Sequence, residues 1–169
     1  MAESVIRVGL ISDTHGFLRR EALEQLQGSD LIIHAGDVGA PDIVPKLQEI
    51  APVAVVRGNI DKGDWASDLA SSAALEVGEV AIYALHNLND IDLHPDKAGF
   101  QVVVYGHTHK PAQRKRSGVL YINPGSAGPL RFRLPVTIAF LDIEGTSIRT
   151  RFVDLTTGED FEPEIERVN

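Results

Sequence analysis

Three short apolar segments near the start of the chain alternate with two segments of helical periodicity. The apolar segments cover residues 5–11, 31–35 and 53–56, and the segments between them, 18–27 and 43–50, carry apolar residues at helical spacing. Apolar runs of this length are typical of strands that are buried on both faces. Because strands that alternate with helices form βαβ units, the pattern predicts a parallel sheet.

Each of these three apolar segments ends in polar side chains that can bind cations. Asp13 and His15 follow the first segment, Asp37 follows the second and Asn59 follows the third. Ligands of parallel sheets bind beside the carboxyl ends of the strands. We therefore expect these side chains to gather at one edge of the sheet.

Further imidazoles follow in the middle of the chain. Residues 102–104 are predicted to form a buried strand, which leads through Gly106 to His107 and His109, and His86 ends another predicted strand. Glycine lets the backbone turn sharply just before the histidine pair. In an extended segment the side chains at i and i+2 point to the same side, so both rings of the pair are expected to face one pocket.

The rest of the chain carries mainly signals for antiparallel strands. We expect a short helix at 92–98 and strands at 74–77, 80–84, 113–122 (as a hairpin), 136–142 and 147–154. An α/β front half and an antiparallel back half predict an α/β protein of two facing mixed β-sheets flanked by helices. No linker or repeat divides residues 1–169, which are interpreted as a single domain, with residues 155–169 as an acidic, solvated or frayed tail.

The composition excludes several kinds of site and partner. The chain has no cysteine, so a metal must be held by His, Asp, Glu or Asn, a set that suits manganese, iron, magnesium or zinc. A formal net charge of −8 argues against general nucleic-acid binding, which requires an excess of Lys and Arg. There is no signal-peptide pattern and no apolar run of the roughly 18 residues that a membrane helix needs. We therefore expect a cytoplasmic protein without a membrane partner.

The polar strand ends together supply more ligands than one metal ion requires. These seven residues are Asp13, His15, Asp37, Asn59, His86, His107 and His109. Seven oxygen or nitrogen ligands suit two ions that share a bridging carboxylate. Two divalent ions roughly 3.5–4 Å apart bind a hydroxide between them and make a nucleophile available at neutral pH. This chemistry favours hydrolysis of a phosphoester by in-line attack of the metal-bridging hydroxide.

The order of these motifs resembles the calcineurin-like metallophosphoesterase superfamily over about residues 5–155. The forms HAGD and NPGS are similar to its small prokaryotic phosphodiesterases, which implies a four-layer αββα sandwich. The resemblance implies a first metal on Asp13, His15 and His109, a second metal on Asn59, His86 and His107, and Asp37 as the bridge. It further implies catalytic roles for Asp37, Asn59 and His107 and two divalent ions, with manganese favoured over iron, zinc, nickel or magnesium.

The chain departs from the family pattern at two places. Many members of the family carry a histidine directly after the asparagine, where this chain has Ile60. A metal-bound water or another residue would then supply the proton to the leaving group, or the substrate would carry a leaving group good enough to need none. The histidine motif that usually reads Gly-His-Gly is Leu85-His86-Asn87 here.

Five residues near the motifs are interpreted as surroundings of the site rather than ligands. His34 is expected to be structural, and Asp61 is expected to order its loop. Trp65 is interpreted either as a lip over the substrate or as a loop anchor or subunit contact. Arg131 and Arg133 lie near the NPGS turn, which is expected to support the site from behind. For both arginines a contact with a phosphate ester is the less favoured interpretation.

Three functions are compatible with this pattern. The first is a phosphodiesterase for a small phosphoester, and the second is a phosphomonoesterase with the same metals. The third is a protein-interaction scaffold like the retromer subunit of the same superfamily, in which the metal site is degraded. Because all seven ligand positions are filled here, catalysis is favoured, whereas an apolar surface around Trp65 would favour the scaffold. The physiological substrate and the oligomeric state, including a homo-oligomer, stay open.

Overall fold

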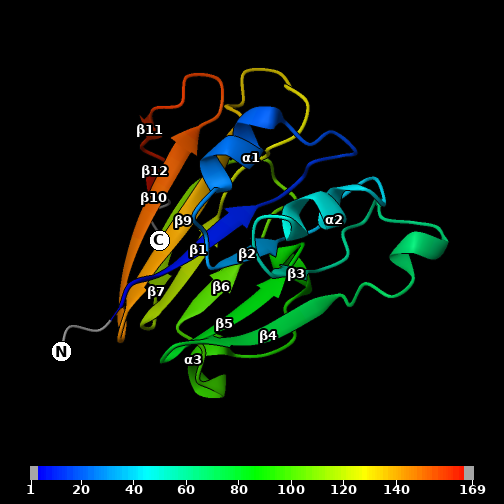
Figure 1. The fold of residues 1–169 in the computed structure, drawn as a ribbon. Helices are drawn as coiled ribbons and strands as arrows, with labels where there is room; N and C mark the ends of the chain where they lie inside the picture. Colours follow the sequence, from blue (N-terminus) through cyan, green and yellow to red (C-terminus); the bar gives the residue numbers. More distant parts are fainter. Residues whose placement is uncertain (1–3, 166–169) are drawn as a thin grey trace.

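The computed structural model describes residues 4–165, which form two six-stranded β-sheets that face each other (Figure 1). The first sheet has the strand order β11-β10-β9-β1-β2-β3. Its strands are β1 (Ile6–Ile11), β2 (Leu31–His34), β3 (Val53–Val55), β9 (Thr137–Glu144), β10 (Ser147–Asp154) and β11 (Asp160–Phe161). The first three are parallel, as the βαβ pattern predicts, and the others pair antiparallel.

The second sheet is also mixed and has the order β12-β7-β8-β6-β5-β4. Its strands are β4 (Ser72–Val77), β5 (Val80–Leu85), β6 (Val102–Val104), β7 (Ala112–Arg116), β8 (Val119–Asn123) and β12 (Glu164–Ile165). The expected hairpins β4–β5 and β7–β8 are antiparallel, whereas β6 runs parallel to both of its neighbours. The expected pair of facing mixed sheets is therefore confirmed.

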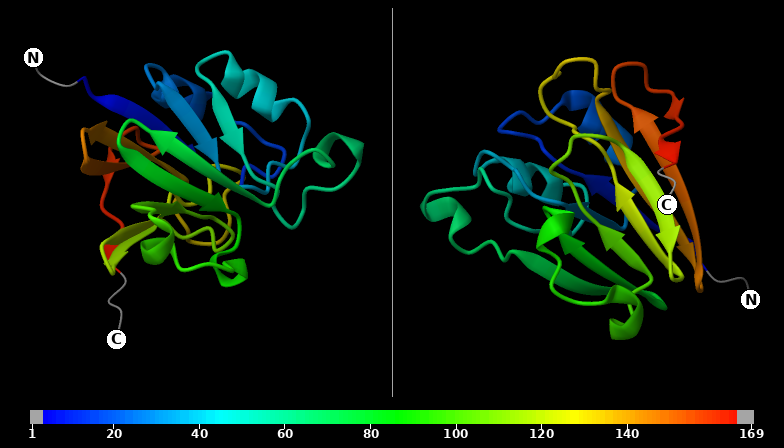
Figure 2. Two further views of the ribbon diagram at one scale, coloured as in Figure 1. Left: turned by 90° about the horizontal axis from the view of Figure 1, so that it is seen from below. Right: turned by 180° about the vertical axis from the view of Figure 1, so that it is seen from behind.

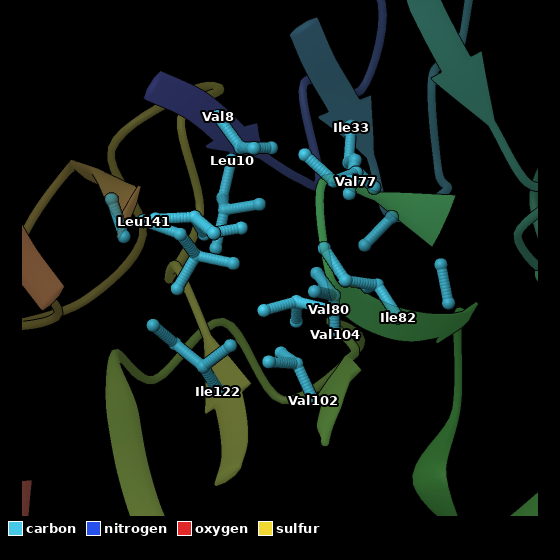
Figure 3. Packing of buried hydrophobic residues seen from close by; sticks show 14 of the residues in the cluster. Val8, Leu10, Ile33, Val77, Val80, Ile82, Val102, Val104, Ile122 and Leu141 are labelled. Atoms are coloured by element: carbon cyan, nitrogen blue, oxygen red, sulfur yellow. The ribbon is translucent and has the colours of Figure 1, made fainter. Parts of the chain in front are cut away.

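Apolar side chains from both sheets fill the space between them (Figure 3). Leu10 and Ile33 extend from the first sheet toward Ile82, Val104 and Ile122 of the second, and all five are fully buried. Burial of such side chains stabilises a fold by roughly 1.5–3 kcal/mol each. The sandwich is thus a rigid base for the loops that leave its strands.

Helices cover the outer faces of the sandwich. α1 (Arg20–Leu26) and α2 (Ile43–Gln48) pack on the first sheet (Figure 2). On the second sheet the outer cover is the segment 88–100, which contains α3 (Pro95–Ala98) and the 3-10 turn η2 (Leu88–Asp90). This is the expected four-layer αββα arrangement, with a thin fourth layer.

All three helices are shorter than their sequence patterns predict. Arg19 stays extended before α1, and Gln27 leaves the helical region after it. The third helix begins only at Pro95, whose ring fixes a helical φ at the first turn. A further 3-10 turn, η1 (Asp64–Ala66), follows β3. No helix within residues 4–165 is long and apolar enough to cross a membrane.

The expectation of a solvated or frayed tail over residues 155–169 is wrong for the part that the structure describes. Residues 160–161 pair antiparallel with β10, and residues 164–165 pair parallel with β7. The tail therefore adds one short edge strand to each sheet. Backbone pairing to two existing strand edges outweighs the acidic composition. Residues 166–169 lie outside the described part of the chain.

Candidate metal centre

Five of the seven predicted ligands have a left-handed backbone. Their φ values lie between 49° and 73°, and the residues are Asp13, His15, Asp37, His107 and His109. Residues other than glycine seldom adopt this region, and each one costs roughly 1–3 kcal/mol. The expectation that extended i, i+2 geometry aims these pairs is therefore wrong. Tight turns just after the strands direct the side chains, and the strain gathers at the site.

Close backbone approach also shapes the site. A Cβ on Gly58 would collide with the backbone and carboxylate of Asp37, and a Cβ on Gly106 would collide with Ser12 and approach Asp13 Oδ2 to 2.7 Å. Glycine at these two positions lets the loops after β3 and β6 contact the two carboxylates. The sequence motifs Gly-Asn and Gly-His thus have a steric origin.

The first cluster joins Asp13, His15 and His109. Asp13 Oδ1 lies 3.3 Å from His109 Nε2 and 3.7 Å from His15 Nε2. Asp13 Oδ1 and His15 Nε2 are both buried without a hydrogen-bond partner among the described residues. Buried polar atoms without partners are costly, and an ion or a water ordinarily satisfies them.

The second cluster lies next to the first. Asp37 Oδ2 is 3.3 Å from His15 Nε2 and also 3.3 Å from His86 Nε2, so it stands between the two clusters. Asn59 Oδ1 is 3.0 Å from His86 Nε2 and 3.1 Å from His107 Nδ1. All seven predicted side chains are thus brought together. The histidine pair is divided between the two clusters, because His109 contacts the first and His107 the second.

Hydrogen bonds orient both carboxylates. Asp13 Oδ2 accepts bonds from the Ser12 hydroxyl at 2.7 Å and the His107 backbone N–H at 3.1 Å. Asp37 Oδ1 accepts the Ile60 backbone N–H at 3.1 Å. In each carboxylate one oxygen is held in place and the other faces the histidines. Sequence reasoning missed Ser12, although its position directly before Asp13 at a buried strand end was a usable signal.

The histidine tautomers differ between the clusters. The carbonyl oxygen of Ala35 lies 2.8 Å from His86 Nδ1, so this nitrogen donates and Nε2 keeps its lone pair toward the centre. That is the tautomer of a metal ligand. His15 Nδ1 instead lies 3.2 Å from the Arg131 guanidinium, which can only donate. A cation on His15 Nε2 would place the ring proton on Nδ1 and release Arg131.

The charges of the site favour cations. Burial by itself raises the pKa of Asp13, but the close imidazoles of His109 and His15 and the hydrogen bond from Ser12 outweigh it and hold the pKa well below the ordinary value. Burial also raises the pKa of Asp37, and the contact with His86 together with the hydrogen bond from the Ile60 N–H lowers it by more. The pKa of His86 is raised because its contacts with the carboxylates outweigh its burial. Two ionised carboxylates thus face a group of imidazole nitrogens.

Residues around the clusters support them. His34 is fully buried; its Nδ1 accepts the Gly36 N–H and its Nε2 contacts the Thr14 hydroxyl, and burial lowers its pKa to about 4. Asp61 accepts three backbone N–H groups, from residues 38, 39 and 58. Asn123 of the NPGS turn donates to the Gly106 carbonyl oxygen. The structural roles expected for His34, Asp61 and this turn are confirmed.

Trp65, Arg131 and Arg133 have different surroundings in the structure. Trp65 packs against the cluster beneath α1 and α2, which favours a loop anchor over a substrate lip. Arg131 reaches His15, whereas Arg133 lines a separate cavity with Lys110 and Phe161. The sequence pattern treats the two arginines alike, and the path of the loop distinguishes them.

Donor chemistry and geometry both fit divalent cations. Carboxylate, amide and imidazole groups that can serve as metal ligands lie within a few ångströms of one another. Two of their buried atoms have no hydrogen-bond partner in the described part of the chain. Nitrogen and oxygen ligands of this kind suit manganese, iron or zinc. The residues therefore fit a metal centre.

Comparisons with known proteins agree with this geometry. Residues 6–146 match the calcineurin-like phosphoesterase superfamily domain. The probable metallophosphoesterase YsnB of Bacillus subtilis is 32% identical over 91% of this chain and 94% of its own length. Phosphodiesterase MJ0936 of Methanocaldococcus jannaschii is 27% identical over 85% of this chain and 97% of its own. Vacuolar protein sorting 29 of Cryptosporidium parvum has a similar fold, with a TM-score of 0.79, 21% identity and coverage of 93% and 95% of the two chains. The chain belongs to the calcineurin-like phosphoesterase superfamily.

Proposed function

We propose that this protein is a dinuclear-metal-dependent phosphodiesterase that hydrolyses a small phosphodiester. The observation that carries the proposal is the pair of buried, unpartnered atoms Asp13 Oδ1 and His15 Nε2 beside the Asp37 carboxylate. Nothing in the fold requires such a costly group of polar atoms, whereas cation binding does. The phosphodiesterase name of the relative from Methanocaldococcus jannaschii supports the choice of a diester.

In this proposal the seven side chains hold two ions. Asp13, His15 and His109 would hold the first ion, Asn59, His86 and His107 would hold the second, and Asp37 would serve both. Such ions, with manganese favoured, would supply an activated water for in-line attack and would neutralise the charge of the phosphate. The chain's own carboxylates carry a charge of about −2 there, so two divalent ions leave a net positive site that attracts a phosphate.

Three side chains position the substrate in this proposal. The Oδ1 atom of Asn59 faces His86 and His107, so the side-chain NH₂ group of Asn59 is free to donate a hydrogen bond to a phosphate oxygen. His107 is exposed next to the second cluster, and the exposed Arg131 contacts His15 at the first cluster. Ile60 offers no proton to a leaving group. We therefore expect the enzyme to favour alcohols that leave as stable anions.

Two alternatives make different predictions. A phosphomonoesterase would use the same ligands and would hydrolyse p-nitrophenyl phosphate faster than the diester. A protein-interaction scaffold is favoured by the fold likeness to vacuolar protein sorting 29 and by the exposed Phe132 and Leu130, 95% and 66% accessible. The complete ligand set and the packed Trp65 favour hydrolysis.

The deciding experiment is the hydrolysis of bis(p-nitrophenyl) phosphate by chelator-stripped protein. We expect no turnover without metal and restored turnover with manganese, tested beside iron, zinc, nickel and magnesium. The monoester p-nitrophenyl phosphate serves as the parallel substrate. Folded protein that binds none of these metals and hydrolyses neither ester would exclude the enzyme and leave the scaffold.

A further inference from the structure

A cavity of about 270 Å³ adjoins the second cluster. It lies between the loop after β3, the start of β4, the end of β5 and the η2 segment. Asn59 and His86 of the second cluster form part of its wall. A phosphate held at that cluster would therefore have one of its two ester groups next to this cavity.

Polar side chains line much of the wall of this cavity. Among the described residues, six lining side chains make no hydrogen bond or ion pair: Arg57, Ser71, Ser72, Tyr83, Asp90 and Asp92. Asn87 also lines the cavity, and its amide oxygen already accepts the Asn89 N–H, so its NH₂ remains available. A concave site with several convergent polar groups is typical of a ligand pocket.

Tyr83 is the most informative of these residues. Its side chain is only 8% exposed, and its ring packs against Phe100 with a centroid distance of 5.2 Å. Its hydroxyl has no hydrogen-bond partner among residues 4–165, and the residue lines the cavity, so this hydroxyl is available to a ligand there.

The charges of the wall restrict the chemistry of this ligand. Asp90 and Asp92 only accept hydrogen bonds and Arg57 only donates them, while serine and tyrosine hydroxyls do both. The wall is therefore net negative by one charge, which disfavours a second phosphate. An alkyl group would make no hydrogen bond with these polar side chains. Vicinal hydroxyl groups can donate to the carboxylates and accept from Arg57 and Asn87.

We propose that this cavity, named the Tyr83 pocket, binds a polyhydroxylated alcohol of the phosphodiester, such as a glycerol or sugar group. The inference rests on the proposed function because it places the phosphate at the metal centre. It narrows the substrate from any small diester to one that joins a phosphate to a polyol.

The test uses three p-nitrophenyl phosphodiesters whose second alcohol is methanol, glycerol or choline. With the metal-loaded protein we expect kcat/KM for the glycerol ester to exceed that for the methyl ester about tenfold. A ratio of this size corresponds to the contribution of one or two additional hydrogen bonds. A choline ester that is preferred over the glycerol ester would overturn the polyol assignment in favour of a cationic group. Equal values for all three would overturn the pocket itself.

Two variants and one matched control localise the effect. Tyr83→Phe keeps the ring packing and removes the hydroxyl, and Asp92→Asn keeps the shape and removes the charge. We expect each to lower the preference for the glycerol ester about threefold to tenfold and to leave the methyl ester unchanged. Tyr121→Phe makes the same change on β8, where the ring contacts Arg114 outside the pocket, and should change neither substrate.

A binding measurement separates this inference from the proposed function. Calorimetry should show glycerol 3-phosphate binding to the metal-loaded protein about tenfold more tightly than methyl phosphate, with the difference lost in Tyr83→Phe. If that difference is found but no diester is hydrolysed with any metal, the hydrolase proposal falls and the pocket stands. If hydrolysis is found but neither measurement shows a preference for the glycerol compound, the pocket falls and the hydrolase stands.

Discussion

Replacing Asp37 with asparagine removes the negative charge that lies between the two clusters. In the structure its Oδ2 is 3.3 Å from both His15 Nε2 and His86 Nε2, and its Oδ1 accepts the Ile60 N–H. Asparagine can keep the bond to Ile60 through its own Oδ1. Its NH₂ group then occupies the position of Oδ2, and an amide nitrogen with two protons cannot bind a cation. The substitution therefore acts on both proposed metal sites at once.

The size of the effect follows from these contacts. Changing a partner that only orients a metal ligand lowers metal affinity by roughly 10- to 100-fold. Because Asp37 would contact both ions directly, we expect losses of about 100-fold or more in manganese affinity and in kcat/KM, which corresponds to at least about 2.7 kcal/mol of transition-state stabilisation. The fold should persist, since the change also removes like-charge repulsion with Asp13.

Manganese binding by calorimetry, turnover of bis(p-nitrophenyl) phosphate and thermal unfolding of the metal-stripped protein test this reasoning together. Asp42→Asn is the matched control, because Asp42 is exposed and its carboxylate pairs with Lys46 on the surface, away from the centre. The control should behave as the wild type in both metal binding and turnover. An Asp37→Asn protein with near-normal turnover would refute the dinuclear centre.

Three further predictions concern residues around the centre. Arg131→Ala should raise KM for bis(p-nitrophenyl) phosphate about tenfold, because Arg131 reaches the site. Arg133→Ala should change KM less than twofold, because Arg133 lines a separate cavity. Equal effects of the two substitutions would argue against a phosphate contact of Arg131. Ile60→His should raise kcat more for alkyl phosphodiesters than for nitrophenyl ones, since only poor leaving groups need a proton; a uniform change would exclude a leaving-group role. Burial lowers the pKa of His34 to about 4, so between this value and its ordinary pKa near 6.5 the unfolded chain binds a proton that the folded protein does not. As the pH is lowered from 7 to 5, the free energy of unfolding of the metal-stripped protein should therefore fall by about 2 kcal/mol because of His34. Urea denaturation of the wild type and of His34→Gln at both pH values measures this contribution as the difference between the two proteins. An identical pH dependence in the two proteins would contradict the assignment.

Much of the architecture could be predicted because it depends on local patterns. Apolar runs separated by helical periodicity are properties of neighbouring residues, and they predicted the parallel arrangement of β1, β2 and β3. The antiparallel hairpins were predicted from their turns, such as Ser117-Gly118 between β7 and β8. Element ends were less accurate, since packing and not periodicity decides where a helix such as α1 stops.

The candidate ligand residues could also be predicted from the sequence. Polar residues directly after buried strands must lie at the carboxyl edge of the sheets, and the structure gathers all seven there. The means of gathering them was not available. Left-handed turns at Asp13, Asp37 and His109 depend on backbone bonds between distant loops, such as that from the Asp13 N–H to the Gly36 carbonyl oxygen.

The sequence by itself determined the candidate cation ligands, the parallel arrangement of the three front strands and the family to which the chain belongs. Tertiary structure alone decided that the acidic tail pairs with both sheets, that Arg131 and not Arg133 reaches the centre, and that polar side chains from four segments line one cavity with Tyr83. The physical reason is the same in each case. Strand-edge pairing, the path of a loop and the walls of a cavity join residues far apart in the chain, and no local periodicity records those contacts.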